Sequence, residues 1–224
     1  MATAALLTAK PFTSIANGLS PVTGYRINTN NLVLAHTGNI TIASGNQTLQ
    51  QIAKLKNSSS NLIMLHAGNS APACAGQPVY DASMHTGASF SVAADDYKII
   101  HRDDIKTGII TANDQSASAE SINTLALYLK KEKKCHLVVC MSQLGYRSAN
   151  GLNDLDLAAA STHLDIIIGG HEKDFCTRPV IAQNKNKEEV IINHAANSGL
   201  ALRLIEIGFD GRGKKGKVAF TKAC

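Results

Sequence analysis

The sequence predicts an α/β fold whose strands are covered on both faces. From residue 32 onward, short apolar runs alternate with amphipathic stretches, and several of these runs are continuously apolar. Continuous apolar strands are typical of sheets that carry a layer on each face. With 224 residues, of which 44% are hydrophobic and 17% charged, the chain is long enough to bury a full core in one domain.

The first elements form one β-α-β unit. Residues 31–38 (NLVLAHTG) and 61–69 (NLIMLHAGN) are apolar runs that end near a glycine, so each predicts a strand. The stretch between them, 47–57, has apolar residues at helical spacing.

A pair of strands and a well-marked helix follow. Residues 96–114 predict two strands around a polar turn. Residues 118–134 predict a helix with Ser118 or Ser121 as its N-cap and lysines in its last turn, where they complement the helix dipole. The helix has one apolar stripe, formed by Ile122, Leu125 and Leu129.

The second half of the chain continues the alternation. Residues 135–146 predict a buried strand, 152–162 a helix and 164–171 a further strand. Residues 189–199 and 200–210 predict two more strands, of which the second alternates like a half-exposed strand.

Polar residues follow these predicted strands. The strand exits lie at residues 36–41, 66–69, 142–146, 169–173 and 193–198. Ligands of open α/β sheets bind at the carboxyl ends of the strands, so we expect a polar site there.

Composition excludes several classes of function. The net charge is +5, and the dense basic run at 212–217 is interleaved with glycines, which predicts a turn between two strands. Aromatic residues make up 4% with no Trp, so we expect no nucleic-acid binding. No run of 18 apolar residues predicts a membrane span. The five cysteines show no C-x-x-C spacing and are expected to be small buried residues.

The strand exits, in this order, resemble the N-terminal domain of the 5′-nucleotidase family of calcineurin-like metallophosphoesterases. LVLAHTGNITIAS resembles the block that ends in H-T-N-D-x-H, and NLIMLHAGN a strand that ends in G-D. HLVVCMSQLGY resembles a strand that ends in S-H-L-G, and LDIIIGGHEKDF one that ends in G-G-H-x-H. The resemblance covers about residues 32–210 and implies a metallophosphoesterase-type β-sandwich of mixed sheets flanked by helices, with four αββα layers.

The family's chemistry requires residues that this sequence mostly lacks. Two divalent metals activate water in such enzymes, and they are held by anionic carboxylates and neutral imidazoles. The resemblance places these ligand positions at Asn39, Thr41, Asn69, Gln143, His171 and Lys173. Only His171 keeps a ligand of the expected type, whereas Asn39 and Asn69 cannot neutralise metal charge and Lys173 adds a positive charge.

The resemblance therefore implies a degenerate, non-catalytic domain without a resident cofactor. We expect it to bind a phosphate-containing small molecule, with Lys173 and Arg147 as anion-binding groups, or a separate chain that carries a nucleoside-binding domain. The alternative is an active phosphomonoester or 5′-nucleotide hydrolase with an altered site that uses Mn, Zn, Co or Mg.

Four histidines at predicted strand exits leave another alternative open. They are His36, His66, His171 and His194. If they converge, they form a mononuclear zinc site or an acid/base cluster. If they do not, His36 and His66 are hydrogen-bonded structural residues beneath the strand ends.

The domain organisation has two expected parts. Residues 1–30 form an N-terminal tail, in which Ser14-Ile15-Ala16 resembles the cleavage site of an export signal, and residues 31–224 form the metallophosphoesterase-like domain, with no C-terminal nucleoside-binding domain. We therefore expect an exported, periplasmic protein, and the alternative is a cytoplasmic protein with a disordered tail.

Overall fold

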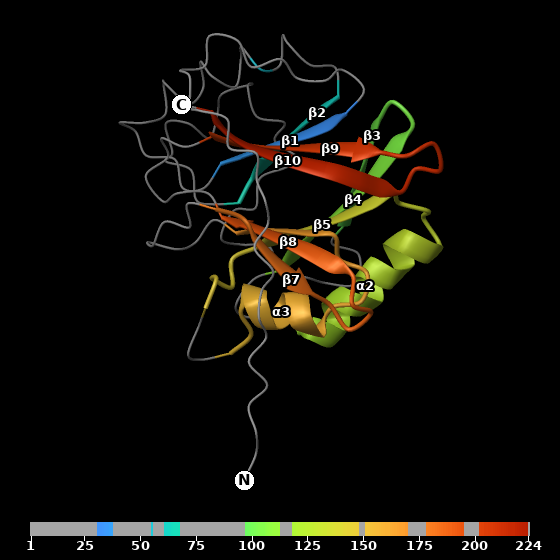
Figure 1. The fold of residues 1–224 in the computed structure, drawn as a ribbon. Coiled ribbons are helices and arrows are strands. Elements are labelled where there is room, and N and C mark those ends of the chain that lie inside the picture. The colour runs from blue at the N-terminus through green and yellow to red at the C-terminus, as the bar shows by residue number, and fades with distance from the viewer. Residues whose placement is uncertain are drawn as a thin grey trace.

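Two packed β-sheets with helices on the outer face of one of them make up the described part of the chain (Figure 1). The structure is a computed structural model, and it describes residues 31–37, 55, 61–67, 97–112, 118–147, 151–169, 178–194 and 202–223. No helix in these ranges is long and apolar enough to cross a membrane.

The first sheet has four strands in the order β10-β9-β1-β2. They are β1 (Leu32–Thr37), β2 (Leu62–His66), β9 (Leu202–Phe209) and β10 (Lys215–Ala223). The strands β1 and β2 are parallel, as the predicted β-α-β unit requires, and the hairpin of β9 and β10 pairs with β1 through β9, which is antiparallel to it. Of the predicted helix at 47–57, only Leu55 belongs to the described residues, and it is helical.

The second sheet has six strands in the order β3-β4-β5-β6-β8-β7. They are β3 (Tyr97–Arg102), β4 (Ile105–Ala112), β5 (Leu137–Ser142), β6 (Ile166–Gly169), β7 (Val180–Gln183) and β8 (Glu189–His194). The four central strands are parallel, and an antiparallel strand flanks them at each edge. Sequence reasoning missed β7, which is only four residues long and half-exposed.

The predicted helix at 118–134 is α2 (Ala119–Lys131). Both N-cap candidates take part in its start, because the Ser118 side chain accepts the backbone N–H of Ser121 at 3.0 Å and the Ser121 hydroxyl faces the backbone N–H of Ser118 at 3.3 Å. This capping box satisfies N–H groups that have no partner within the helix. The second helix, α3 (Asp154–Ala160), begins in the same way, with the side chain of Asn153 as its N-cap.

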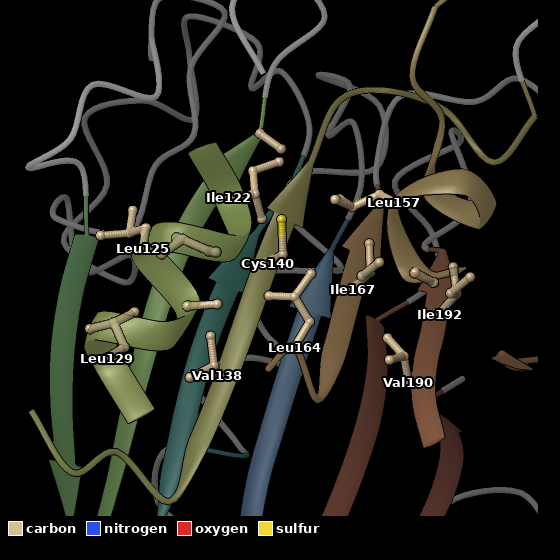
Figure 2. Packing of buried hydrophobic residues seen from close by; sticks show 14 of the residues in the cluster. Ile122, Leu125, Leu129, Val138, Cys140, Leu157, Leu164, Ile167, Val190 and Ile192 are labelled. Carbon is tan, nitrogen blue, oxygen red and sulfur yellow. The ribbon is translucent and has the colours of Figure 1, made fainter. Parts of the chain in front are cut away.

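The second sheet has an apolar layer on each face. In β5, Leu137, Val139 and Met141 contribute to the core between the two sheets. The alternate residues Val138 and Cys140 pack against α2 and α3 (Figure 2). Because side chains alternate along a strand, a strand with apolar layers on both faces reads as a continuous apolar run. The mixed α/β fold with packed sheets and flanking helices is thereby confirmed.

The expectation that residues 200–210 form a half-exposed strand is wrong. In β9, every residue from Leu202 to Ile207 is buried, so side chains on both faces of the strand are covered. Its two charged residues, Arg203 and Glu206, are only 5% and 9% exposed. Glu206 accepts a hydrogen bond from the Asn31 side chain at 2.7 Å, so its charge is buried with a partner.

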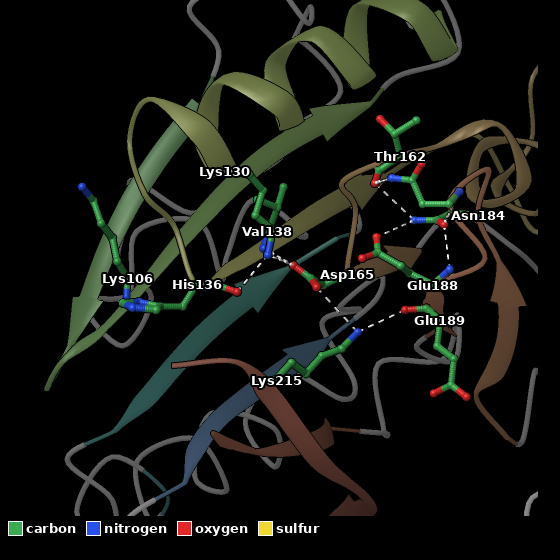
Figure 3. A network of polar contacts seen from close by, with 11 residues as sticks. Lys106, Lys130, His136, Val138, Thr162, Asp165, Asn184, Glu188, Glu189 and Lys215 are labelled. Carbon is green, nitrogen blue, oxygen red and sulfur yellow. Dashed lines mark hydrogen bonds and ion pairs between the residues drawn. The ribbon is translucent and has the colours of Figure 1, made fainter. Parts of the chain in front are cut away.

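A polar network ties the two sheets and α2 together on the side where β5 begins (Figure 3). Asp165 accepts the backbone N–H of Val138 at 2.7 Å and pairs with Lys130 of α2 at 2.6 Å. Its other oxygen lies 3.6 Å from Lys215, at the start of β10. The basic run at 212–217 thus forms the predicted turn between two strands together with the beginning of the second strand.

Candidate functional site

The carboxyl ends of the parallel strands lie together at one end of the molecule. At the opposite end, Leu32, which begins β1, and His136, which precedes β5, line one cavity of about 530 Å³ with the turns after β3 and β9. Since β1 and β5 begin beside the same cavity, their exits share the other end. The cavity is therefore remote from the predicted site.

Two of the predicted site residues lie on the loop that follows β5. Gln143 is half-buried, and its backbone N–H bonds to the carbonyl of Ala112 at 2.8 Å. Arg147 is exposed, four positions further along the chain. The other predicted positions lie outside the described residues, so their roles stay predictions. They are Asn39, Thr41, Asn69, His171 and Lys173.

A buried polar chain joins the exits of β5 and β8 to the start of α3. Asp154 is 0% exposed and accepts a hydrogen bond from the hydroxyl of Ser142. Its second oxygen, Oδ2, lies 2.7 Å from Nε2 of His194, the last residue of β8. The Ser142 hydroxyl in turn accepts the backbone N–H of Leu144 at 3.1 Å, which fixes the first turn of the β5 exit loop.

The contact between His194 and Asp154 is short, although its angles do not meet those of a hydrogen bond. At 2.7 Å the ring nitrogen and the carboxylate oxygen are in direct contact. Both side chains are almost fully buried, at 3% and 0% exposure, so water does not compete for the contact. The contact joins the end of β8 to the start of α3.

Gly169, at the end of β6, makes room for the His194 ring. The two residues are Cα partners in neighbouring strands. A Cβ on Gly169 would lie 2.3 Å from Cε1 and 2.5 Å from Nε2 of that ring. The ring cannot swing away easily, because its Nε2 contacts Asp154. The His194 ring can therefore occupy this position beside Asp154 only if residue 169 is glycine.

We expect Gly169→Ala to lower the free energy of unfolding by about 1–3 kcal/mol, the usual cost of overpacking a filled core. Urea denaturation measures it, with Gly211→Ala as the control, because a Cβ there would meet no atom within 4 Å. His194→Ala in the Gly169→Ala background removes the clash, so the two substitutions should not be additive. Additive effects would contradict this interpretation.

His36, on β1, is a second buried group at the strand exits. It is 0% exposed, and neither ring nitrogen has a hydrogen-bond partner among the described residues. Burial, with the charges of Arg203 and His194, lowers the pKa of His36 from 6.5 to about 3. The expectation of a hydrogen-bonded structural histidine is therefore wrong for His36, which is a neutral imidazole beside a buried arginine.

The histidines converge only in part. His194 lies close enough to His36 to contribute to the lowering of the His36 pKa. His66 ends β2 and is the Cα partner of Thr37, and His171 lies outside the described residues. In the described part of the chain, no three His, Cys, Asp or Glu side chains are grouped so that they could hold a metal ion.

The described residues do not fit a two-metal centre. Gln143 offers a neutral amide, and Asp154 is already engaged by Ser142 and His194. Arg203, the Cα partner of His36, places a buried positive charge at the same end of the sheets. A divalent cation there would face repulsion without an available carboxylate among these residues to offset it.

The arrangement of Ser142, Asp154 and His194 also does not fit a serine hydrolase. Such an enzyme places the imidazole between the serine and the carboxylate, so that the imidazole takes the serine proton. Here the carboxylate of Asp154 lies in the middle. Ser142 is only 1% exposed, so its hydroxyl cannot reach a substrate. The three side chains Ser142, Asp154 and His194 can orient the β5 exit loop, but they cannot attack an ester.

Sequence reasoning missed Asp154. It included Ser142 and His194 among the strand exits but treated the start of α3 as an ordinary helix. One signal was available, because Asp154 shares the buried face of α3 with Leu157 and Ala158 at helical spacing. A carboxylate on an apolar face requires a buried partner, since an unpaired charge there is costly.

The fold is that of 5′-nucleotidases and related phosphoesterases. A 5′-nucleotidase precursor from Thermus thermophilus superposes with a TM-score of 0.61 at 16% identity, over 86% of this chain and 54% of that one. The NAD nucleotidase of Haemophilus influenzae gives 0.61 at 14% identity, over 86% and 49%. A putative 5′-nucleotidase from Staphylococcus aureus gives 0.54 at 11% identity, over 86% and 54%.

These likenesses establish the fold alone, because the identities are low. The chain spans about half the length of the three solved structures. Its sequence matches no protein-family profile and no curated protein.

Proposed function

We propose that this chain is a phosphoesterase-fold domain that binds a phosphate-bearing ligand without a two-metal centre and without turnover. The observation that carries the proposal is the charge at the strand exits. Arg203 is a buried cation at this end of the sheets, and Arg147 is an exposed cation on the β5 exit loop. The buried carboxylate of Asp154 is already engaged. Such an arrangement attracts an anion.

The sequence at the predicted ligand positions supports the same conclusion. Amides at Asn39 and Asn69 offer hydrogen bonds to phosphate oxygens but no negative charge to a metal. Lys173, which together with Arg147 forms the predicted anion-binding pair, adds a further positive charge. A separate chain that carries a nucleoside-binding domain is the macromolecular partner we propose, and co-purification tests it. Export is likewise a proposal, tested by cell fractionation.

The second candidate function is an active phosphomonoester or 5′-nucleotide hydrolase with an altered metal site. The names of the solved structures favour it, since they describe nucleotidases with the same fold. In this case His171 would remain as a metal ligand, and the metal would be Mn, Zn, Co or Mg.

One set of measurements on the purified chain separates the two functions. We expect inorganic phosphate and AMP to bind in isothermal titration calorimetry equally well with and without EDTA. We expect neither a stoichiometric metal nor turnover of p-nitrophenyl phosphate or AMP when Mn²⁺, Co²⁺ or Zn²⁺ is supplied. Stoichiometric metal together with turnover that His171→Ala abolishes would establish the hydrolase instead.

A further inference from the structure

Three side chains are in contact in the order His194, Tyr146 and Arg147. They connect buried Asp154 to the exposed end of the β5 exit loop. The ring of Tyr146 meets the ring of His194 edge to face, with centroids 5.7 Å apart and an angle of 80° between the planes. The guanidinium carbon of Arg147 lies 5.5 Å from the centroid of the same Tyr146 ring. His194 is fixed below by Asp154, which also holds Ser142.

We infer that Tyr146 is a positioning residue that holds the Arg147 guanidinium at the exits of β5 and β8, where it captures the phosphate group of the ligand. This inference rests on the proposed function, because it names the group that binds the anion and the group that orients it. The ligand chemistry is a phosphate mono- or dianion, which a planar guanidinium can bind through two parallel N–H groups.

The physical reason is the conformational freedom of an exposed arginine. Such a side chain loses considerable rotamer entropy when a ligand immobilises it. Stacking on an aromatic face restricts the guanidinium before the ligand arrives. Stacking helps only if the ring is itself fixed. Tyr146 meets that condition, because its ring contacts His194, which is 3% exposed and paired with Asp154.

A matched pair at the other end of the molecule serves as the control. The Lys133 ammonium lies 5.1 Å from the centroid of the Tyr128 ring, at the end of α2 that precedes β5. This pair has a similar cation and ring geometry but is remote from the strand exits. Replacing Tyr128 therefore reports what losing an exposed stacked tyrosine does to the fold alone.

The test is a double-mutant cycle on phosphate binding. Isothermal titration calorimetry with inorganic phosphate and with AMP gives the affinities of wild type, Arg147→Ala, Tyr146→Ala, the double variant, Tyr146→Phe and Tyr128→Ala. We expect Arg147→Ala to weaken binding roughly tenfold, as loss of a charge-assisted hydrogen bond does. We expect Tyr146→Ala to weaken it about two- to fivefold, the range for an exposed cation and ring pair.

Coupling between the two residues decides the outcome. If Tyr146 acts through Arg147, Tyr146→Ala has no further effect in the Arg147→Ala background, and Tyr146→Phe binds like wild type because it keeps the ring. Independent effects of the two substitutions, or an equal loss in Tyr128→Ala, overturn the inference and leave the proposed function intact. Absence of phosphate and AMP binding to the wild type overturns both.

Discussion

Replacing Asp154 by alanine should lower the free energy of unfolding by about 2–6 kcal/mol, because two buried polar groups then lose their partner, at about 1–3 kcal/mol each. Asp154 is fully buried and serves two groups, the hydroxyl of Ser142 and the ring of His194. Neither group has access to water that could replace the carboxylate, since these two residues are only 1% and 3% exposed. Chemical denaturation followed by circular dichroism measures the loss.

Asp156→Ala is the matched control, because Asp156 belongs to the same first turn of α3 but is exposed. Its side chain gives up one contact, from the Asn153 side chain at 2.6 Å, so we expect a loss of no more than about 1 kcal/mol. Asp154→Asn should fall between the two, since an amide keeps an acceptor oxygen for Ser142 but replaces the second oxygen, which contacts His194. Equal losses in Asp154→Ala and Asp156→Ala would show that the buried chain does not stabilise the fold.

The sequence predicted those elements of the fold whose two faces are both apolar or whose ends are marked by caps. The run at 135–146 predicted β5, because apolar layers on both faces leave no alternation. Ser118 and Ser121 predicted the start of α2 because serine side chains can satisfy the free N–H groups there. The strand β7 was missed because it is short and stabilised by pairing with β8, which no local pattern reveals.

The candidate site was predictable to a smaller extent. The exits of parallel strands were expected to share one end of the molecule, and the placement of the cavity beside the starts of β1 and β5 agrees with this. The partnership of Asp154 with Ser142 and His194 was not predictable, because it depends on packing between a helix and two strands. The burial of Arg203 was equally hidden, since its strand alternates like an exposed one.

His36 makes the stability of this protein depend on pH. The pKa of His36 is about 3 in the folded chain, against 6.5 for an ordinary histidine. Between these values the unfolded chain binds a proton that the folded chain does not, so the free energy of unfolding falls as the pH is lowered through this range. From pH 7 to pH 4 the contribution of this one group is a loss of about 3 kcal/mol.

His36→Leu isolates this contribution. Because neither ring nitrogen has a hydrogen-bond partner among the described residues, we expect the substitution to change the free energy of unfolding by less than about 1 kcal/mol at pH 7. At pH 4 the variant should be more stable than wild type by about 3 kcal/mol, because it has no proton to exclude. Denaturant titrations of both proteins at pH 4, 5, 6, 7 and 8 measure the difference, which should become constant above about pH 7. A difference that stays the same from pH 4 to pH 8 would show that His36 is protonated in the folded chain as readily as in the unfolded one, and that burial beside Arg203 does not keep it neutral.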